Sequence, residues 1–348
     1  MDSAADGPVL AVDLGGTQIR TAVVTPDAAV HARRAEPTRD HEGPEALIRR
    51  LGELLAEARS DAAAAGLGTP IGIGISSPGP LDPWRGIVLD PPNLARWQNV
   101  PLGARVAEAT GLPTFVERDT NVAARAEWRY GAARGATDLV YITVSTGVGG
   151  AAIIGGRPLM GPAGMAGEFG HLVVEIGGPR CGCGGLGHVE AIASGIALAR
   201  EGAALVSREP DGELARLAAG GGAVDAALVA RAAAEGDPHS AGLLERAWVA
   251  IGAMCASIVN ALNPEVIVIG GGIAEHHPRL FEVARVELSR QILPALTGRT
   301  RIEQAALGRD VSLIGALPIV QERIGDPRFA AGSHRPQTAA AQQGVPRP

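Results

Sequence analysis

Four residues able to bind a metal ion gather in one glycine-rich stretch, residues 161–194. His171, Cys181, Cys183 and His188 offer the four nitrogen and sulfur ligands that a closed tetrahedral zinc site needs. Taken singly, each is explained as well by a buried thiol or a core histidine. Two of the chain's three cysteines lie here, however. The set of four therefore predicts a structural zinc site.

Two carboxylates accompany these ligands, Glu168 before His171 and Glu190 after Cys183. A metal bound to one ring nitrogen of His171 fixes the ring, so that the other nitrogen is a rigid hydrogen-bonding partner. We therefore expect Glu168, His171 and Glu190 to bind a ligand rich in hydroxyl groups.

The stretch resembles the signature of the ROK family of sugar kinases and sugar-responsive repressors: Glu-Phe-Gly-His, then Cys-Gly-Cys-Gly, then Gly-Cys-x-Glu. His188 stands where that family has a third zinc cysteine, and histidine is also a good zinc ligand. The resemblance spans about residues 8–324. It implies an α/β protein with the actin-like ATPase fold, in which two ribonuclease-H-like lobes enclose a cleft. The matching segments are Glu168-Phe169-Gly170-His171, Cys181-Gly182-Cys183-Gly184 and Gly187-His188-Val189-Glu190.

An aspartate marks the segment expected to carry catalysis. Residues 113–135 read as a short strand followed by a helix, with Asp119 at the junction. Such an acid is often only a helix cap, yet the carboxyl end of a strand is also the usual location of a site in α/β sheets. There it can accept the proton of an attacking hydroxyl. The family's pattern is Asn-Asp-x-Asn, so the resemblance implies that Asp119 is the catalytic base and that Asn121 binds sugar. Arg118 replaces the first Asn, which bears on the choice of sugar.

Two glycine-rich hairpins, residues 8–24 and 139–160, have the same strand-turn-strand pattern and predict two related lobes. Their turns can present backbone amides to phosphate oxygens, although an ordinary hairpin explains either one alone. The resemblance favours phosphate binding, with Asp13 as the Mg2+ ligand. The other candidates for nucleotide binding are Gly15 and Gly16, which permit a sharp turn, with Thr17, Arg20, Thr146, Gly147 and Gly149.

Three further segments supply candidates. The buried strand within 264–274 ends in glycines, and the resemblance implies that Gly271 and Gly272 lie against adenosine. Gly79, in a Ser-Pro-Gly-Pro turn, leaves room for a ligand near the backbone. Asn93 lies in a polar loop expected to face the sugar.

The composition excludes several classes of protein. All 31 basic residues are arginine, so a Walker A loop, a protein kinase and Schiff-base chemistry are excluded, since each needs a lysine. A net charge of -6 gives no general attraction to nucleic acid or to an anionic membrane. The sequence has no run of eighteen apolar residues and no secretion signal, so we expect a cytoplasmic protein.

Together with these observations, the resemblance to the ROK family implies an ATP- and Mg2+-dependent hexose kinase with a structural zinc ion, acting as a homodimer or homotetramer and converting glucose to glucose 6-phosphate. Polyphosphate as donor, an N-acetylmannosamine or N-acetylglucosamine kinase and a catalytically silent sugar sensor stay open. A repressor fits less well, because only about eight residues precede the first strand. The expected parts are a first lobe over 8–121 completed by a helix over 311–324, a second lobe over 122–310 with the zinc loop 171–188, and a disordered tail over 325–348.

Overall fold

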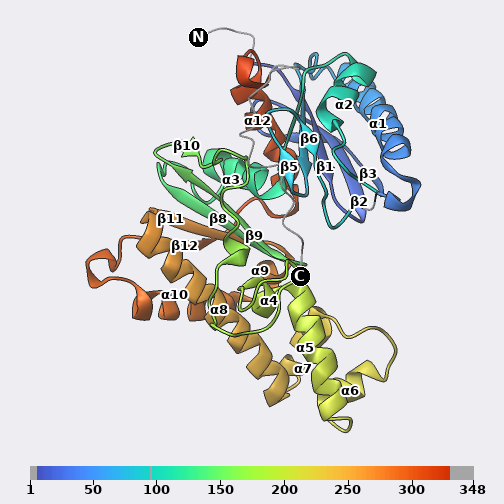
Figure 1. Ribbon diagram of the computed structural model, residues 1–348. Helices are drawn as coiled ribbons and strands as arrows, with labels where there is room; N and C mark the ends of the chain where they lie inside the picture. The colour runs from blue at the N-terminus through green and yellow to red at the C-terminus, as the bar shows by residue number, and fades with distance from the viewer. Residues whose placement is uncertain (1–5, 95, 330–348) are drawn as a thin grey trace.

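The computed structural model describes residues 6–94 and 96–329. Figure 1 shows two lobes, one above the other, and each is built around a five-stranded sheet. The two sheets have the same topology. In each, three antiparallel strands from a hairpin and its extension are followed by two strands parallel to the first.

The first sheet has the order β3-β2-β1-β4-β7. Its strands are β1 (Val9–Leu14), β2 (Gln18–Val24), β3 (Val30–Pro37), β4 (Ile73–Ser77) and β7 (Thr114–Arg118). A small two-stranded ribbon, β5 (Leu81–Asp82) with β6 (Ile87–Val88), follows β4.

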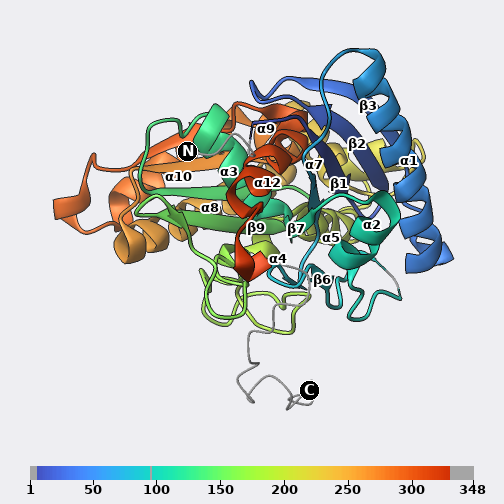
Figure 2. The ribbon, with the colours of Figure 1, turned by 90° about the horizontal axis from the view of Figure 1, so that it is seen from above.

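Alternating residues of β1 enter two different hydrophobic cores, as the two-residue period of a strand requires. Leu10, Val12 and Leu14 pack in one core with α1 (Pro44–Ala64) and α2 (Leu102–Thr110). Val9 and Ala11 pack in the other, with α11 (Val311–Ile314) and α12 (Ala316–Arg323). The last helices of the chain therefore cover the first lobe, as Figures 1 and 2 show for α12 in red.

The second sheet has the order β10-β9-β8-β11-β12. One face carries α8 (Pro238–Leu262) and α10 (Pro278–Gln291), which share the largest core of the protein with the sheet. The strands are β8 (Leu139–Val144), β9 (Val148–Ile154), β10 (Arg157–Pro158), β11 (Val266–Gly270) and β12 (Arg301–Gln304). The remaining helices of this lobe are α4 (Glu190–Ala193), α5 (Gly195–Arg208), α6 (Glu213–Ala218), α7 (Ala226–Ala234) and α9 (Gly272–His276).

Helix α3 (Asp119–Tyr130) connects the lobes. Its alanines pack against the second sheet, whereas Val122 belongs to the core of α11 and α12 in the first lobe. The domain boundary that the sequence suggests, between residues 121 and 122, falls inside this helix. Asp119 is its first residue.

The segment 311–324 differs from the single helix expected. It forms α11 and α12, which are separated at Gly315. A Cβ atom on Gly315 would lie 2.3 Å from the carbonyl oxygen of Val122 in α3. The glycine therefore allows the chain between α11 and α12 to approach α3 closely.

The first residues of the segment predicted as a disordered tail are structured. Pro327–Phe329 form a 3-10 helix, and the ring of Phe329 packs against the core beside α12. Residues 330–348 lie outside the described part of the chain.

Helix α8 is the one helix in the described ranges that is long and apolar enough to cross a membrane. Of the most apolar 18-residue segment of this helix, 61% is buried inside the protein. Such burial is typical of a core helix, and Trp248 and Ile251 of α8 indeed lie in the core of the second lobe.

Candidate active site

Asp119 lies where β7 ends and α3 begins. One carboxylate oxygen accepts a hydrogen bond from the backbone N–H of Thr120, 2.7 Å away. The side chain therefore satisfies one free donor of the helix start, as a capping residue does. It is also exposed to a cavity between the lobes, so the capping and catalytic interpretations are compatible.

The position of this carboxylate in the cleft raises its pKa to about 6, mainly through desolvation. The bond from Thr120 opposes the increase, whereas the negative charge of Asp13 adds to it. A carboxylate with a pKa close to neutral pH is suited to accept a proton.

The cavity beside Asp119 has a volume of about 690 Å³. The first lobe contributes Arg20, and the second contributes the residues at the ends of β8 and β11. Gly271 and Gly272 line it, where the sequence predicted adenosine contacts. Its other walls include Thr143, Ser145, Glu275, His276, Gln304, Ala305, Ala306, Gly308, Arg309 and Ser312.

The first hairpin turn needs Gly16 for close packing and not for the sharp turn expected from the sequence. Within the described residues, Gly15 and Gly16 do not adopt positive φ angles. A Cβ on Gly16 would instead lie 2.9 Å from the carbonyl oxygen of Asn93. The turn and the loop around Asn93 are therefore in contact, and Thr17 beside them is exposed.

The second hairpin turn lies between the zinc loop and α3. A Cβ on Gly147 would meet the carboxylate of Glu190 at 2.8 Å, and one on Gly149 would meet the methyl group of Thr120 at 3.0 Å. Thr146 is exposed, and its carbonyl oxygen accepts the backbone N–H of Ile196 at the start of α5. The turn is thus adjacent to the junction that carries Asp119.

Asp13 and Arg20 form an ion pair on neighbouring strands. Two guanidinium nitrogens of Arg20 donate to one oxygen of Asp13 at 2.9 and 2.5 Å, and a third donates to the carbonyl of Arg309. The other oxygen of Asp13 makes no hydrogen bond to any described residue. Oxygen ligands and partial exposure fit Mg2+, which binds through one or two carboxylates and substrate phosphates.

Arg118, the residue before Asp119, joins the two lobes. Its guanidinium pairs with the carboxylate of Glu168 and donates to the carbonyl of Ala166 at 2.5 Å. Gly79 lies against the stem of this arginine, since a Cβ there would be 3.2 Å from Cδ. The side chain of Arg118 is 4% exposed, whereas that of Glu168 is 50% exposed and available to a ligand.

Two predicted sugar contacts have different surroundings. Asn121 is buried, and its amide donates to Glu117 at 3.0 Å and lies 3.9 Å from the sulfur of Met160. Asn93 is exposed beside the first hairpin turn. Among the described residues that line the 690 Å³ cavity, the predicted sugar ligands are not found. Sugar binding by these residues stays a prediction.

The four predicted metal ligands come together in space. The ligand atoms of His171, Cys181, Cys183 and His188 all lie within 4.8 Å of one another. A zinc ion with bonds of about 2.0–2.3 Å places tetrahedral ligands about 3.3–3.8 Å apart. Burial lowers the pKa of His188, which favours the neutral ring that a metal needs. The donor set and its spacing therefore fit zinc.

Glu190 connects this cluster to the second hairpin turn. One of its oxygens accepts the backbone N–H of Val148 at 3.1 Å, and the other lies 3.5 Å from the sulfur of Cys181. A fixed zinc loop therefore also fixes the position of Glu190 relative to the turn.

Sequence reasoning missed two buried carboxylates, Glu117 and Glu127, which are 0% exposed. Glu117 accepts hydrogen bonds at the β7–α3 junction, and Glu127 accepts the backbone N–H groups of Ala306 and Leu307 in the cavity wall. In the sequence both look like ordinary charged residues. No local pattern distinguishes them from exposed acids, because the partners that compensate their charges are distant in the chain.

The duplicated sheets, the connecting helix and the cavity between the lobes define the class of actin-like ATPase folds. The chain belongs to the ROK family, whose sequence model matches residues 9–323. The family and fold expected from the sequence are thereby confirmed.

Similar proteins include a glucokinase of Thermotoga maritima, 34% identical over 317 residues, which cover 91% of this chain and 98% of that protein. An N-acetylmannosamine kinase of Shigella flexneri is 36% identical over 278 residues, 79% of this chain and 87% of that protein. Among solved structures, a ROK family glucokinase from Streptomyces griseus in complex with glucose and AMPPNP has a TM-score of 0.76 and 30% identity, covering 91% of this chain and 100% of its own. These relatives agree with the enzyme class expected, a sugar kinase.

Proposed function

We propose that the protein is an ATP- and Mg2+-dependent hexose kinase with glucose as its acceptor. The observation that carries this proposal is the position of Asp119, which lines the 690 Å³ cavity and lies close enough to the Arg118–Glu168 pair to feel both of its charges. A base between a nucleotide cavity and a sugar site is the arrangement that phosphoryl transfer to a hydroxyl requires.

In the proposed reaction the carboxylate of Asp119 accepts the proton of a sugar hydroxyl, expected to be that on C6. The hydroxyl oxygen forms a bond to the γ-phosphorus while the bond from that phosphorus to the bridging oxygen breaks, and ADP leaves. Mg2+, when bound with the nucleotide, neutralises charge on the phosphates. Asp13 is the side chain proposed to hold it, and the two hairpin turns are proposed to bind the phosphates.

We place the sugar against the exposed carboxylate of Glu168, near His171 of the zinc loop and Glu190 at the start of α4. Carboxylate oxygens accept hydrogen bonds from hydroxyl groups, and zinc at His171 would hold the loop in position without taking part in the transfer. ATP is the proposed donor, and the AMPPNP complex of the Streptomyces griseus relative supports it over polyphosphate.

The similarity to N-acetylmannosamine kinase makes an amino sugar the second candidate. Both can be tested by a coupled ADP-release assay with MgATP and glucose, mannose, fructose, N-acetylglucosamine or N-acetylmannosamine, alongside Asp119→Asn. Turnover of one sugar that the variant loses supports the kinase and names the acceptor. A sugar that raises the melting temperature without ADP release would instead identify a sensor.

Arg118 is the residue on which the choice of sugar is proposed to depend, because it occupies one side of Glu168. Arg118→Asn frees that carboxylate and supplies both a donor and an acceptor. One additional hydrogen bond predicts a KM for glucose about tenfold lower. Arg118→Lys, which retains the charge, is the matched control, and an unchanged KM in Arg118→Asn would exclude this role.

A further inference from the structure

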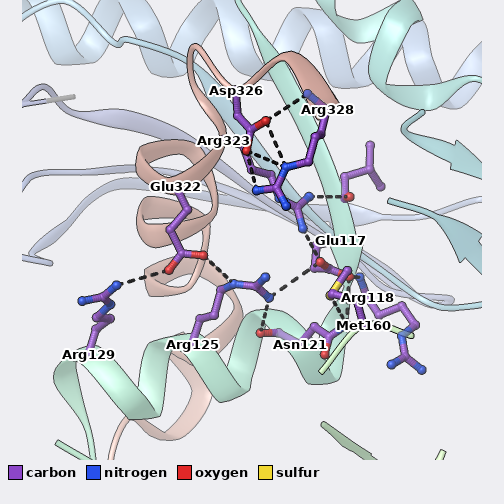
Figure 3. Close-up of polar contacts among 11 residues, drawn as sticks. Glu117, Arg118, Asn121, Arg125, Arg129, Met160, Glu322, Arg323, Asp326 and Arg328 are labelled. Carbon is purple, nitrogen blue, oxygen red and sulfur yellow. Dashed lines mark hydrogen bonds and ion pairs between the residues drawn. The ribbon is translucent and has the colours of Figure 1, made fainter. Parts of the chain in front are cut away.

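Glu117 divides its two carboxylate oxygens between different partners, as Figure 3 shows. Oε1 accepts the backbone N–H of Arg118 at 2.9 Å and the side-chain amide of Asn121 at 3.0 Å. These two donors lie immediately before and two residues after Asp119. One buried oxygen therefore holds the chain on both sides of the proposed base.

Oε2 of Glu117 faces cations from two helices. Arg323 of α12 forms a close ion pair with it, and Arg125 of α3 lies 3.6 Å away. All three side chains are at least 95% buried, so water does not screen their charges. Although burial by itself would raise the pKa of Glu117, the two arginines outweigh it and leave the pKa lowered, so the carboxylate is ionised.

Arg323 is itself held in place by further contacts. A second nitrogen of its guanidinium donates to the carbonyl oxygen of Val116 in β7 at 3.1 Å. The guanidinium also lies over the ring of Phe329, 4.3 Å from the ring centre. Because the cation is fixed on three sides, it fixes the carboxylate of Glu117 and directs Oε1 toward the junction.

We propose that the ion pair between Glu117 and Arg323 positions Asp119 for phosphoryl transfer, so that helix α12 contributes to the catalytic step without touching the substrate. Glu117 and Arg323 are positioning residues in this proposal, which rests on the proposed role of Asp119 as base. A proton acceptor displaced by about 1 Å can lose on the order of 100-fold in rate, so a small rotation of Glu117 is sufficient to matter.

The test compares the full chain with Arg323→Met, which removes the cation while keeping an unbranched side chain. We expect kcat of the folded variant to fall about tenfold to 100-fold, with KM for sugar and for MgATP changed by less than about threefold. Arg323→Lys keeps the charge but loses the two donors of the guanidinium fork. Its kcat should therefore lie between that of the wild type and that of Arg323→Met.

Glu322→Gln is the matched control. Glu322 is the neighbour of Arg323 on α12 and pairs with Arg125 at 2.9 Å and Arg129 at 3.4 Å. It reaches Glu117 only through Arg125, and the variant keeps both cations that face Glu117. We expect its kcat to stay within about twofold of the wild type. An equal loss of kcat in Glu322→Gln and Arg323→Met would overturn the proposal, because any ion pair of α12 would then have the same effect.

The double variant Glu117→Gln/Arg323→Met separates positioning from stability. Replacing both charges removes the stranded carboxylate, so the melting temperature should recover relative to Arg323→Met, while kcat should stay low. If kcat recovers together with the melting temperature, the pair has only a structural role.

Hydrogen exchange of the Arg118 backbone amide gives a readout that does not need turnover. This amide donates to Glu117, and we expect it to exchange about tenfold faster in folded Arg323→Met, but not in Glu322→Gln. If the wild type phosphorylates no sugar, the proposed function fails, and unchanged exchange at Arg118 would independently refute the positioning role. If Arg323→Met does not fold, the comparison of Arg323→Lys with Glu322→Gln decides, by kcat and by exchange of the Arg118 amide.

Discussion

Asp119 must be ionised to accept a proton, yet its surroundings favour the neutral acid. Desolvation is the largest cause of its raised pKa, and Asp13 contributes through its charge. The price of a base with a pKa near 6 is therefore a less stable folded state at neutral pH.

The first prediction concerns activity against pH. Because only ionised Asp119 can act as base, kcat should decrease tenfold per pH unit below about 6, where its pKa lies. Asp119→Asn should reduce kcat by roughly 100-fold to 10,000-fold at every pH. Both the pH dependence of the wild-type kcat and the loss of kcat in the variant can be measured by steady-state kinetics between about pH 5 and 8. An acidic limb that survives in the residual activity of the variant would assign the titration to another group.

The second prediction concerns stability against pH. The folded-state pKa of Asp119 is about 6, above its ordinary value of 3.8, so the folded state binds the proton more tightly. Its contribution to stability is complete below the lower value and is lost as the pH rises through the higher one. Asp119→Asn should therefore raise the melting temperature at neutral pH, and the increase should disappear in acid. A variant less stable than the wild type at neutral pH would contradict this interpretation.

At the scale of an element, the zinc loop is a segment with few regular hydrogen bonds of its own. Isolated bridges, Val173 with His188 and Arg180 with Leu186, are the strand pairings described within it. Ile176 is 99% exposed, so the loop does not bury all its apolar residues in the lobe. A metal is thus expected to supply much of its order.

The third prediction tests this metal. The purified protein should contain about one zinc ion per chain, and His188→Ala should lose it, whereas His188→Cys should keep it. Loss of zinc should raise KM for sugar, because Glu190 and His171 are no longer fixed. Cys255→Ala removes a buried thiol outside the loop and is the control that keeps the metal. Metal analysis that finds zinc retained in His188→Ala would show that the site lies elsewhere.

Glu127 supports the wall of the cavity proposed to bind the nucleotide. One oxygen accepts the N–H groups of Ala306 and Leu307, both at 2.9 Å, and the other accepts that of Ala132 at 2.7 Å. Helix α3 therefore holds the segment before α11, part of which lines the cavity.

The fourth prediction follows from these bonds. Glu127→Gln removes the negative charge that the N–H groups of Ala306 and Leu307 share. Weakening these charge-assisted bonds, worth about 1.5–3 kcal/mol, should raise KM for ATP about tenfold to 100-fold. Glu265→Gln is the control, since Glu265 also accepts two backbone N–H groups, those of Thr137 and Asp138, neither of which lines the cavity. Equal effects of the two variants on KM for ATP would exclude a specific role for Glu127.

At the scale of the whole molecule, the proposed sites for sugar and nucleotide both use residues of two lobes. Arg20 reaches the carbonyl of Arg309, and Arg118 reaches Glu168. Ligands that bind between the lobes favour a closed arrangement if they contact both, and closure excludes water from the transferred phosphate.

The fifth prediction is that glucose and AMPPNP together reduce the radius of gyration measured by small-angle X-ray scattering. At 100 times its Kd, each ligand should also stabilise the fold by about 2.7 kcal/mol. Asp119→Asn should close in the same way, because its side chain retains its size. A radius that does not change with both ligands, despite a raised melting temperature, would indicate binding to a preformed cleft.

Much of the fold was predictable because local patterns and glycine turns specify it. Both hairpins, the strand before Asp119 and the helix after it appear as expected, since alternating apolar residues and turn signals act within a few residues. That the four predicted metal ligands come together was also predictable, because a loop of eighteen residues, 171–188, contains all four. The close approach of Gly315 to Val122 was not, because the two residues are far apart in the sequence.

The sequence by itself determined the chemistry that is available: a chain without lysine, an aspartate at a strand end, and four metal ligands in one loop. Only the tertiary structure decided which groups act together. It buried Glu117 against Arg323, 206 residues away, and brought Glu127 to the backbone of Leu307, 180 residues away. A single sequence carries no signal for such pairs, because a charged residue looks the same whether water or a distant partner compensates its charge.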